Sequence, residues 1–203
     1  METVDSSLLS FIFSSMSRGT VFFAEDLEGS GFSPDEIRWS LTRIVRDQNG
    51  VIRLARGVFC IPEQADVSGK LLIPSFETIA YALARRWKVR IAPYGAQAAY
   101  LAGFTEIQTH QNTWVSDGSD QVFHLQNGQE IRFVRRLSLK VFQFHSERMR
   151  NLSEAMRFLG KDYIQAEGRG VVSDNLLYVS DEEFNHDIYL CPLWIREILK
   201  ELR

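Results

Sequence analysis

A well-capped amphipathic helix followed at once by a short hairpin is the feature that most constrains how this chain can fold. The segment SPDEIRWSLTRIVRD opens on Ser33, which can cap a helix, and Glu36 completes a capping box. Pro34 suits the first helical position. With about 100° of rotation per residue, the helix has an apolar stripe and a polar, aromatic face opposite it. The stripe holds Ile37, Leu41, Ile44 and Val45, and the opposite face holds Trp39, Thr42, Arg43 and Arg46.

The hairpin follows in GVIRLARGVFCIPE, where two apolar runs flank Ala55-Arg56-Gly57 and Pro62 ends the second run. Upstream, the pattern predicts a helix, a short strand and a brief second helix, over residues 6–16, 20–23 and 24–27. Helix, strand, helix, helix and hairpin is the order of elements in a winged helix-turn-helix. The sequence therefore predicts a winged helix-turn-helix DNA-binding domain over residues 1–66.

In winged helices that bind DNA, the third helix enters the major groove and the hairpin lies against the backbone or the minor groove. We therefore expect binding to duplex DNA through six residues, which are Trp39, Thr42, Arg43, Arg46, Arg53 and Arg56. One alternative stays open, because other winged helices make only protein contacts. The acidic residues Asp35, Glu36 and Asp47 around the same helix favour that alternative.

Residues 63–70 have the composition of a polar linker, and a second domain is expected over residues 70–203. Helical patterns cover the segments 74–87, 94–102, 146–159 and 192–202, and alternating patterns cover 89–92, 113–116, 122–126 and 130–134. Asn127-Gly128 predicts a tight hairpin between the last two strands. DGSD at 117–120 and GRG at 168–170 are expected to be turns. The predicted fold class is thus α+β, with a mixed second domain built on an antiparallel sheet.

The charges are distributed unevenly along the chain. The net charge is −3, yet residues 69–150 carry 11 Lys and Arg against 6 Asp and Glu, while both flanks are acidic. A cluster of like charges destabilises a compact chain, so an isolated basic region indicates a binding role. We expect a partner-binding surface on the second domain, formed by Arg85, Arg86, Lys88, Arg90, Arg132, Arg135 and Arg136. Such a surface would bind an acidic protein partner or extend a DNA footprint. The alternative, in which these are separate solvated charges, stays open.

The chain contains no recognisable catalytic motif. It has no phosphate-binding loop, nucleophile elbow, zinc-protease helix or paired CxxC, and its four histidines are scattered. The best catalytic candidate is Asp120 with Glu130-Ile131-Arg132, which resembles the aspartate and Glu-x-Lys of metal-dependent nucleases. Arginine in place of lysine cannot take over a proton-transfer role. The sequence therefore predicts no enzymatic activity, no metal and no cofactor.

Two further observations concern the cellular location. Cys60 and Cys191 match no metal or redox spacing, so we expect two buried thiols in a reducing compartment. The apolar run Leu8 to Phe13 is short and follows acidic residues, unlike a signal peptide or a membrane span. A cytoplasmic protein without membrane contact is expected.

The chain resembles the AbiEi-like family of bacterial antitoxins from type IV toxin–antitoxin systems. The resemblance rests on RGTVFFAEDL, IRWSLTRIVRDQNGVIRLARGVFCIPE, IAYALARRWKVRIAPYGAQAAYLAGF and TWVSDG, and is weaker in AMRFLGKDYI and PLWIREILKEL. The family motif matches residues 54–57 in the hairpin and 95–99 in the second domain. The resemblance implies a winged helix that represses its own operon, and a second domain that neutralises a nucleotidyltransferase-like toxin.

Three functions are therefore consistent with the sequence. The first is a DNA-binding autoregulator and antitoxin, in which the basic surface of the second domain opposes the toxin. The second is a plain winged-helix transcription regulator without a toxin. The third is a metal-dependent nuclease built on the second domain.

Overall fold

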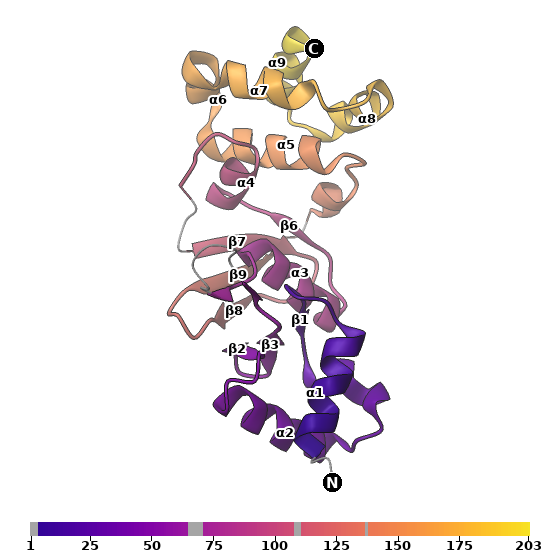
Figure 1. Cartoon of the computed structure of the whole chain (residues 1–203). Helices are drawn as coiled ribbons and strands as arrows, with labels where there is room; N and C mark the ends of the chain where they lie inside the picture. The colour runs from indigo at the N-terminus through magenta and orange to yellow at the C-terminus, as the bar shows by residue number, and fades with distance from the viewer. Residues whose placement is uncertain (1–3, 65–70, 108–110, 137) are drawn as a thin grey trace. The chain divides into compact units, whose positions relative to one another are not determined.

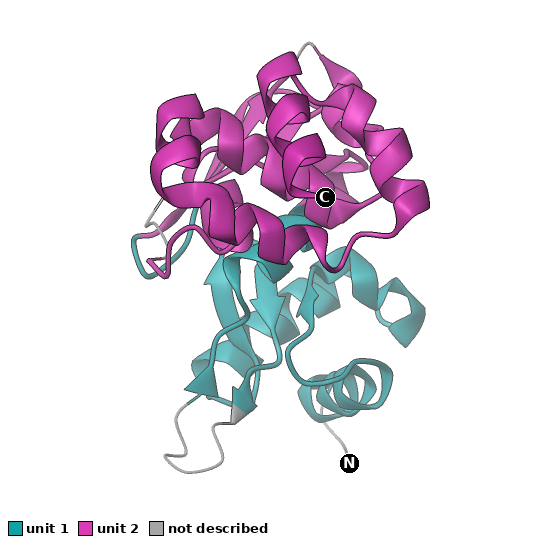
Figure 2. Cartoon of the chain, turned by 90° about the horizontal axis from the view of Figure 1, so that it is seen from above, with its two compact units in different colours: residues 1–83, 124–128 teal, residues 84–123, 129–203 magenta. Residues whose placement is uncertain are grey.

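The computed structural model describes residues 4–64, 71–107, 111–136 and 138–203, and its helices and sheets give the predicted α+β class (Figure 1). The chain divides into two compact units (Figure 2). The first unit extends to residue 83 and includes residues 124–128, and the second comprises residues 84–123 and 129–203. The division therefore falls inside a helix, α3 (Phe76–Trp87), whereas the sequence placed it in the linker at 66–70.

The first unit begins with the predicted winged helix. Its elements are α1 (Val4–Ser15), β1 (Val21–Phe22), the 3-10 helix η1 (Ala24–Ser30), α2 (Pro34–Arg46), β2 (Ile52–Ala55) and β3 (Val58–Cys60). The strands form an antiparallel sheet in the order β1-β3-β2, with Val21 opposite Cys60 and Arg53 opposite Phe59. This order places the hairpin strand β3 in the middle, and the predicted winged helix is confirmed.

The core of the first unit joins the helices to this sheet. Buried side chains from α1, η1, α2 and the strands form one cluster, namely Leu8, Ile12, Phe22, Leu27, Ile37, Leu41, Ile44, Val51, Phe59 and Ile61. Full burial of an aliphatic or aromatic side chain of this size contributes about 1.5–3 kcal/mol. The predicted apolar stripe of α2 is therefore its core-facing side, with Val45 only half-buried at its margin.

Two short strands, β4 (Glu63–Gln64) and β5 (Leu71–Leu72), pair in antiparallel fashion before α3 begins. The predicted polar linker over 63–70 thus begins in a strand, and residues 65–70 lie outside the described residues.

A four-stranded sheet forms the first half of the second unit, with strands in the order β6-β7-β9-β8. The strands are β6 (Ile91–Pro93), β7 (Gln111–Ser116), β8 (Gln121–His124) and β9 (Glu130–Arg135). As predicted, Asn127-Gly128 lies in the short connection between β8 and β9. However, β9 rather than β8 lies beside β7, and this pair is parallel. The sheet is therefore mixed, which corrects the predicted antiparallel sheet.

Helices form the other half of the second unit and lie on one side of the sheet (Figure 1). They are α4 (Ala96–Leu101), η2 (Leu139–Phe142), α5 (Glu147–Leu159), α6 (Lys161–Tyr163), the π-helical η3 (Ile164–Gly168), α7 (Arg169–Leu176), α8 (Asp181–Asp187), η4 (Ile188–Leu190) and α9 (Leu193–Leu202). The sequence predicted α5 and α9 but not the helices between them.

The predicted turn at 168–170 was wrong, because these residues are helical. Gly168 is buried there, and a Cβ atom on it would lie 2.9 Å from Ile164 Cδ1 and 3.2 Å from Phe104 Cε1. This glycine allows close packing of side chains against a helix rather than a turn.

Candidate nucleic-acid interface

Local interactions fix the position of α2, the helix expected to bind DNA. The Ser33 Oγ accepts a hydrogen bond from the Glu36 N–H at 3.4 Å, and the Ser33 N–H donates to Glu36 Oε2 at 2.8 Å. Hydrogen bonds from the Ser33 side chain and backbone lower the pKa of the Glu36 carboxyl. The predicted capping box is confirmed, with Pro34 at the start of the helix. Since one face of α2 is buried in the core, the cap and the core together fix which side chains point outward.

The outward face of α2 carries a large exposed aromatic side chain. Trp39 is 69% exposed, and Thr42 and Arg46 are exposed with it. The Thr42 hydroxyl donates to the Arg38 carbonyl oxygen at 2.9 Å. Arg38 is also exposed, although it is not among the residues predicted to bind DNA. The period of the helix places Arg38 next to Val45 at the margin of the apolar stripe, so the pattern gave no signal for it.

Each arginine of α2 has an acidic partner. Arg43 Nε lies 2.7 Å from Asp5 Oδ2 on α1, and Arg43 Nη2 donates to Asp5 Oδ1 at 2.7 Å. The Arg43 hydrogen bond, followed by one from Ser40, lowers the pKa of the Asp5 carboxyl. On the same helix, Arg46 pairs with Asp47 at 2.9 Å and Arg38 with Asp35 at 3.4 Å. The guanidinium groups are thus present at the predicted face, but their charge is partly compensated.

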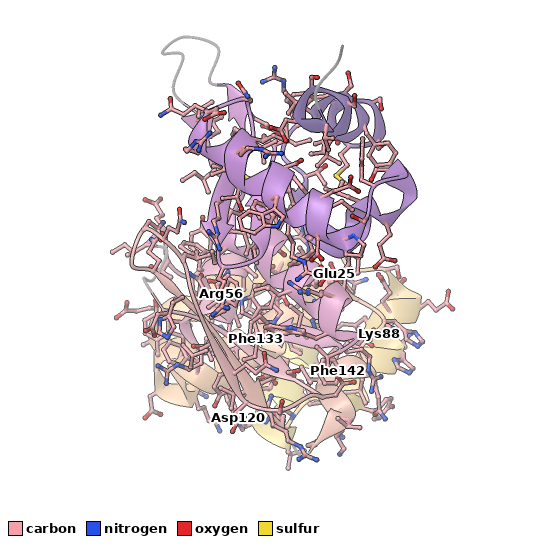
Figure 3. The ribbon with its side chains drawn as sticks, turned by 90° about the horizontal axis from the view of Figure 1, so that it is seen from below. Glu25, Arg56, Lys88, Asp120, Phe133 and Phe142 are labelled. Carbon is pink, nitrogen blue, oxygen red and sulfur yellow. The ribbon has the colours of Figure 1, made fainter. Side chains whose placement is uncertain are left out.

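The hairpin of β2 and β3 places its two arginines differently. Arg56 is exposed at the turn (labelled in Figure 3), and Gly57 beside it adopts a φ of 75° that glycine permits. Within the described residues, Arg56 has no hydrogen bond or ion pair to a side chain or carbonyl group. Arg53 is half-buried and donates through Nε to the Ala55 carbonyl oxygen at 3.3 Å. Arg56 is therefore the more available of the two for a phosphate.

The hairpin does not stand free of the rest of the first unit. Leu54 and Ala55 are 5% and 2% exposed. The Gln126 N–H, in the segment 124–128 that belongs to this unit, donates to the Leu54 carbonyl oxygen at 2.9 Å. This contact joins the outer strand of the hairpin to the segment 124–128, so the hairpin is not a free-standing wing.

All seven residues of the expected partner surface lie in the second unit, but they do not form one uniform patch. Arg85 and Arg86 are exposed at the end of α3, and Lys88 follows in a tight turn with a φ of 57° (labelled in Figure 3). Arg90 binds Asp117 through both its backbone N–H and Nε, each at 2.8 Å. The side-chain hydrogen bond from Arg90 lowers the pKa of the Asp117 carboxyl. Arg90 therefore also fixes the turn that begins at Asp117.

Strand pairing brings some of the arginines together. Ser116 on β7 lies opposite Ile91 on β6 and opposite Arg135 on β9, so Arg90, Arg135 and Arg136 meet at one end of the sheet. Arg136 is half-buried and forms an ion pair with Glu154 at 2.7 Å. Arg132 lies further back along β9 and pairs with Glu130 at 3.5 Å. Of these residues, Arg90, Arg132 and Arg135 are exposed.

The carboxylates of the nuclease alternative do not converge. The Asp120 carboxylate, in the turn before β8 (Figure 3), accepts the backbone N–H of Arg135 at the end of β9. Glu130 is at the start of β9, about 16 Å from Arg135 at the rise of a strand. Two ligands of one divalent ion each lie about 2.0–2.6 Å from it. In the described part of the chain, no three His, Cys, Asp or Glu side chains are grouped so that they could hold a metal ion.

Both cysteines are buried and reduced, as expected. Burial raises the pKa of the Cys60 thiol to about 12 and that of the Cys191 thiol to about 11. A thiol of such high pKa is almost entirely protonated at neutral pH and is a poor nucleophile. Neither cysteine belongs to a reactive site.

Fold and site together define the class of this protein: an α+β protein whose first unit contains a winged helix in which one face of α2 is exposed. A family model matches residues 10–182, and the chain belongs to this family, DUF6088, a family of unknown function. No curated protein matches the sequence.

Among solved structures, the chain is similar to the crystal structure of the RV2827C protein from Mycobacterium tuberculosis. The TM-score is 0.51 at 16% sequence identity, and the match covers 100% of this chain and 78% of that one. At this identity, the similarity concerns the fold alone. Across the stretches 4–64, 71–107, 111–136 and 138–203, no helix has both the length and the apolar character needed to cross a membrane.

Proposed function

We propose that this protein is a DNA-binding transcriptional regulator that binds duplex DNA in its own promoter through α2 and the hairpin. The observation that carries the proposal is the outward face of α2, where Trp39 is 69% exposed beside Thr42 and Arg46. A tryptophan in this position contributes nothing to the core. On a recognition helix it can contact a thymine methyl group or a deoxyribose, while Arg46 meets a phosphate.

The ion pairs of α2 are compatible with this role. Exposed ion pairs of this kind contribute about 0.2–1 kcal/mol each. Exchanging Asp35 or Asp47 for a DNA phosphate therefore costs little, and a phosphate offers the guanidinium group a stronger, charge-assisted hydrogen bond. The same exchange at Arg43 would have to displace Asp5, which holds it at two points. We assign Arg46 and Arg56 to phosphate contacts and expect Arg43 to contribute less to binding.

The antitoxin role is the second part of the proposal and rests on the resemblance to the AbiEi-like family. In this role, the second unit neutralises a nucleotidyltransferase-like toxin through its exposed arginines, chiefly Arg85, Arg86 and Arg135. A plain regulator without a toxin is the alternative, and the genes adjacent to the coding sequence distinguish the two. The separation of Asp120 from Glu130 supports a protein without nuclease activity.

DNA binding can be tested by fluorescence anisotropy with a duplex from the region upstream of the gene. We expect the double variant Arg46→Ala/Arg56→Ala and the variant Trp39→Ala to bind more weakly. The slope of log affinity against log salt should fall by about 0.9 for each lost phosphate contact. Trp39→Ala should weaken binding without changing this slope, because its contact is apolar.

The matched control is Arg18→Ala, which removes an exposed arginine of the first unit outside both α2 and the hairpin. It should bind like the wild type. Wild-type affinity in both the double variant and Trp39→Ala would show that this winged helix makes protein contacts instead.

A further inference from the structure

A cavity of about 370 Å³ lies within the second unit, away from the winged helix. Small-molecule sites in proteins occupy about 300–1,000 Å³, so the cavity has room for a small ligand. Its walls come from four separate parts of the unit and consist of Tyr94, Gly95, Arg136, Glu154, Arg157, Phe158, Pro192 and Trp194.

One side of the cavity carries three charged groups. Glu154 on α5 has only 5% of its side chain exposed, and its carboxylate lies 2.7 Å from Arg136 Nη1. Arg157, one turn further along α5, approaches the same carboxylate at 3.8 Å. The 3.8 Å contact is longer than a hydrogen bond, so the N–H donors of Arg157 keep capacity for another acceptor. Two guanidinium groups facing one carboxylate leave a positive charge without compensation at this wall.

The other walls are aromatic. Tyr94 and Phe158 are 40% and 55% exposed, although both are large apolar side chains. The Arg136 guanidinium lies over the Tyr94 ring at 5.4 Å from its centroid. Gly95 adopts a φ of 60°, which glycine permits, and a Cβ atom there would lie 3.6 Å from Phe158 Cδ2, in ordinary van der Waals contact. Flat rings stack favourably on such side chains, at about 0.5–1.5 kcal/mol beyond the area that they bury.

A second, smaller cavity of about 60 Å³ adjoins the same three charged groups. Arg136, Glu154 and Arg157 line both cavities, and the smaller one adds the Lys140 ammonium and the hydroxyl groups of Ser138 and Ser153. Each of these groups can donate a hydrogen bond to an anion. The polar side of the site thus extends beyond the arginine pair and increases its positive charge.

We propose that this site binds a small molecule that carries a flat ring and an anionic group. The ring stacks among Tyr94, Phe158 and Trp194, and the anionic group binds Arg157 beside the Arg136–Glu154 pair. A nucleoside monophosphate and an aromatic carboxylate share this chemistry. The proposal does not depend on DNA binding, since every lining residue belongs to the second unit.

Isothermal titration calorimetry on the full chain tests the site with two probes, adenosine 5′-monophosphate and indole-3-carboxylate. Adenosine supplies the ring without the anion, and inorganic phosphate supplies the anion without the ring. At least one of the two probes should bind about tenfold more tightly than adenosine and than inorganic phosphate, since a charge-assisted hydrogen bond adds to stacking. The tighter of the two identifies the ligand class as a nucleotide or an aromatic carboxylate. If neither probe binds more tightly than adenosine and phosphate do, the proposal is wrong.

The variants localise the binding. Arg157→Gln and Phe158→Ser change exposed side chains of the cavity, and each should lower the affinity for the bound probe about tenfold. The matched control is Arg148→Gln, which makes the same charge change on the same helix, where Arg148 lies over the Tyr178 ring at 4.8 Å outside the cavity. It should stay within about twofold of the wild type, as surface changes do. Equal losses in Arg157→Gln and Arg148→Gln, or wild-type affinity in both cavity variants, overturn the proposal.

Discussion

The guanidinium of Arg43 already has an anionic partner before any nucleic acid arrives. Asp5 holds it through two contacts of 2.7 Å, and these hydrogen bonds lower the pKa of the Asp5 carboxyl. Because the folded pKa lies below the ordinary value of 3.8, the pair stabilises the fold fully above that value. This stabilisation is lost as the pH falls through the lowered folded pKa.

We therefore predict that Asp5→Asn has two effects. At neutral pH the free energy of unfolding should fall by less than about 1 kcal/mol, since the pair is partly exposed, and its decline in acid should become shallower. DNA affinity should rise, because Arg43 becomes available to a phosphate. Urea denaturation at pH 7 and pH 3 and anisotropy titrations measure these effects.

Glu28→Gln is the control for the change in net charge, since Glu28 is an exposed carboxylate of the same unit on η1. An equal gain in DNA affinity in both variants would attribute the effect to net charge. A loss of affinity in Asp5→Asn would mean that the Asp5–Arg43 pair itself shapes the DNA-binding face.

At the scale of elements, α2 depends on its cap as much as on its apolar stripe. We predict that Ser33→Ala lowers the free energy of unfolding by about 1 kcal/mol, because the N–H of Glu36 loses its acceptor. Ser33→Asp should retain most of the stability, since aspartate caps helices equally well. Chemical denaturation compares the three proteins, with Ser180→Ala on α8 as the equivalent change in the second unit, where Ser180 accepts from Glu183. An unchanged midpoint in Ser33→Ala would show that the core alone fixes the start of α2.

The same cap explains why the first unit could be predicted so closely from sequence. Its elements are defined by local signals, namely the capping box at Ser33, the left-handed glycine at the hairpin turn and the spacing of apolar residues on α2. The second unit depends on long-range pairing. Asn127-Gly128 predicts the hairpin of β8 and β9, but nothing local tells which of the two strands lies beside β7. Gly168 likewise looks like a turn residue, until the packing of Ile164 and Phe104 against it explains its small size.

The candidate site was predicted in part for the same reason. The outward positions of Trp39, Thr42 and Arg46 follow from the period of one helix. The acidic partner of Arg43 comes from α1, and the Glu154 that binds Arg136 comes from α5. Such contacts join residues far apart in the chain, so the net charge of a segment did not indicate which of its arginines form ion pairs.

At the scale of the whole molecule, the proposed DNA-binding and antitoxin roles use different units, and each should be removable without the other. Charge reversal at Arg90 or Arg136 would also disturb the fold, because Arg90 fixes the turn at Asp117 and Arg136 pairs with the buried Glu154. Arg85, Arg86 and Arg135 are exposed and lie outside the winged helix. We predict that changing these three to glutamate leaves promoter affinity and its salt slope within about twofold of the wild type, and abolishes rescue of cells that express an adjacent nucleotidyltransferase-like gene.

The control for this charge reversal changes three other exposed basic residues of the second unit, Arg148, Lys161 and Lys200, to glutamate. It makes the same change in net charge on the helices α5, α6 and α9, and this variant should still rescue cells that express the toxin gene. Circular dichroism confirms that both triple variants are folded.

Since a charged interface determines association rate and partner choice, charge reversal at the surface that binds the toxin turns attraction into repulsion. Rescue that survives in the Arg85, Arg86 and Arg135 variant, or fails equally in both, would place the toxin contact elsewhere. Weakened DNA binding in that variant alone would instead extend the DNA footprint onto the second unit.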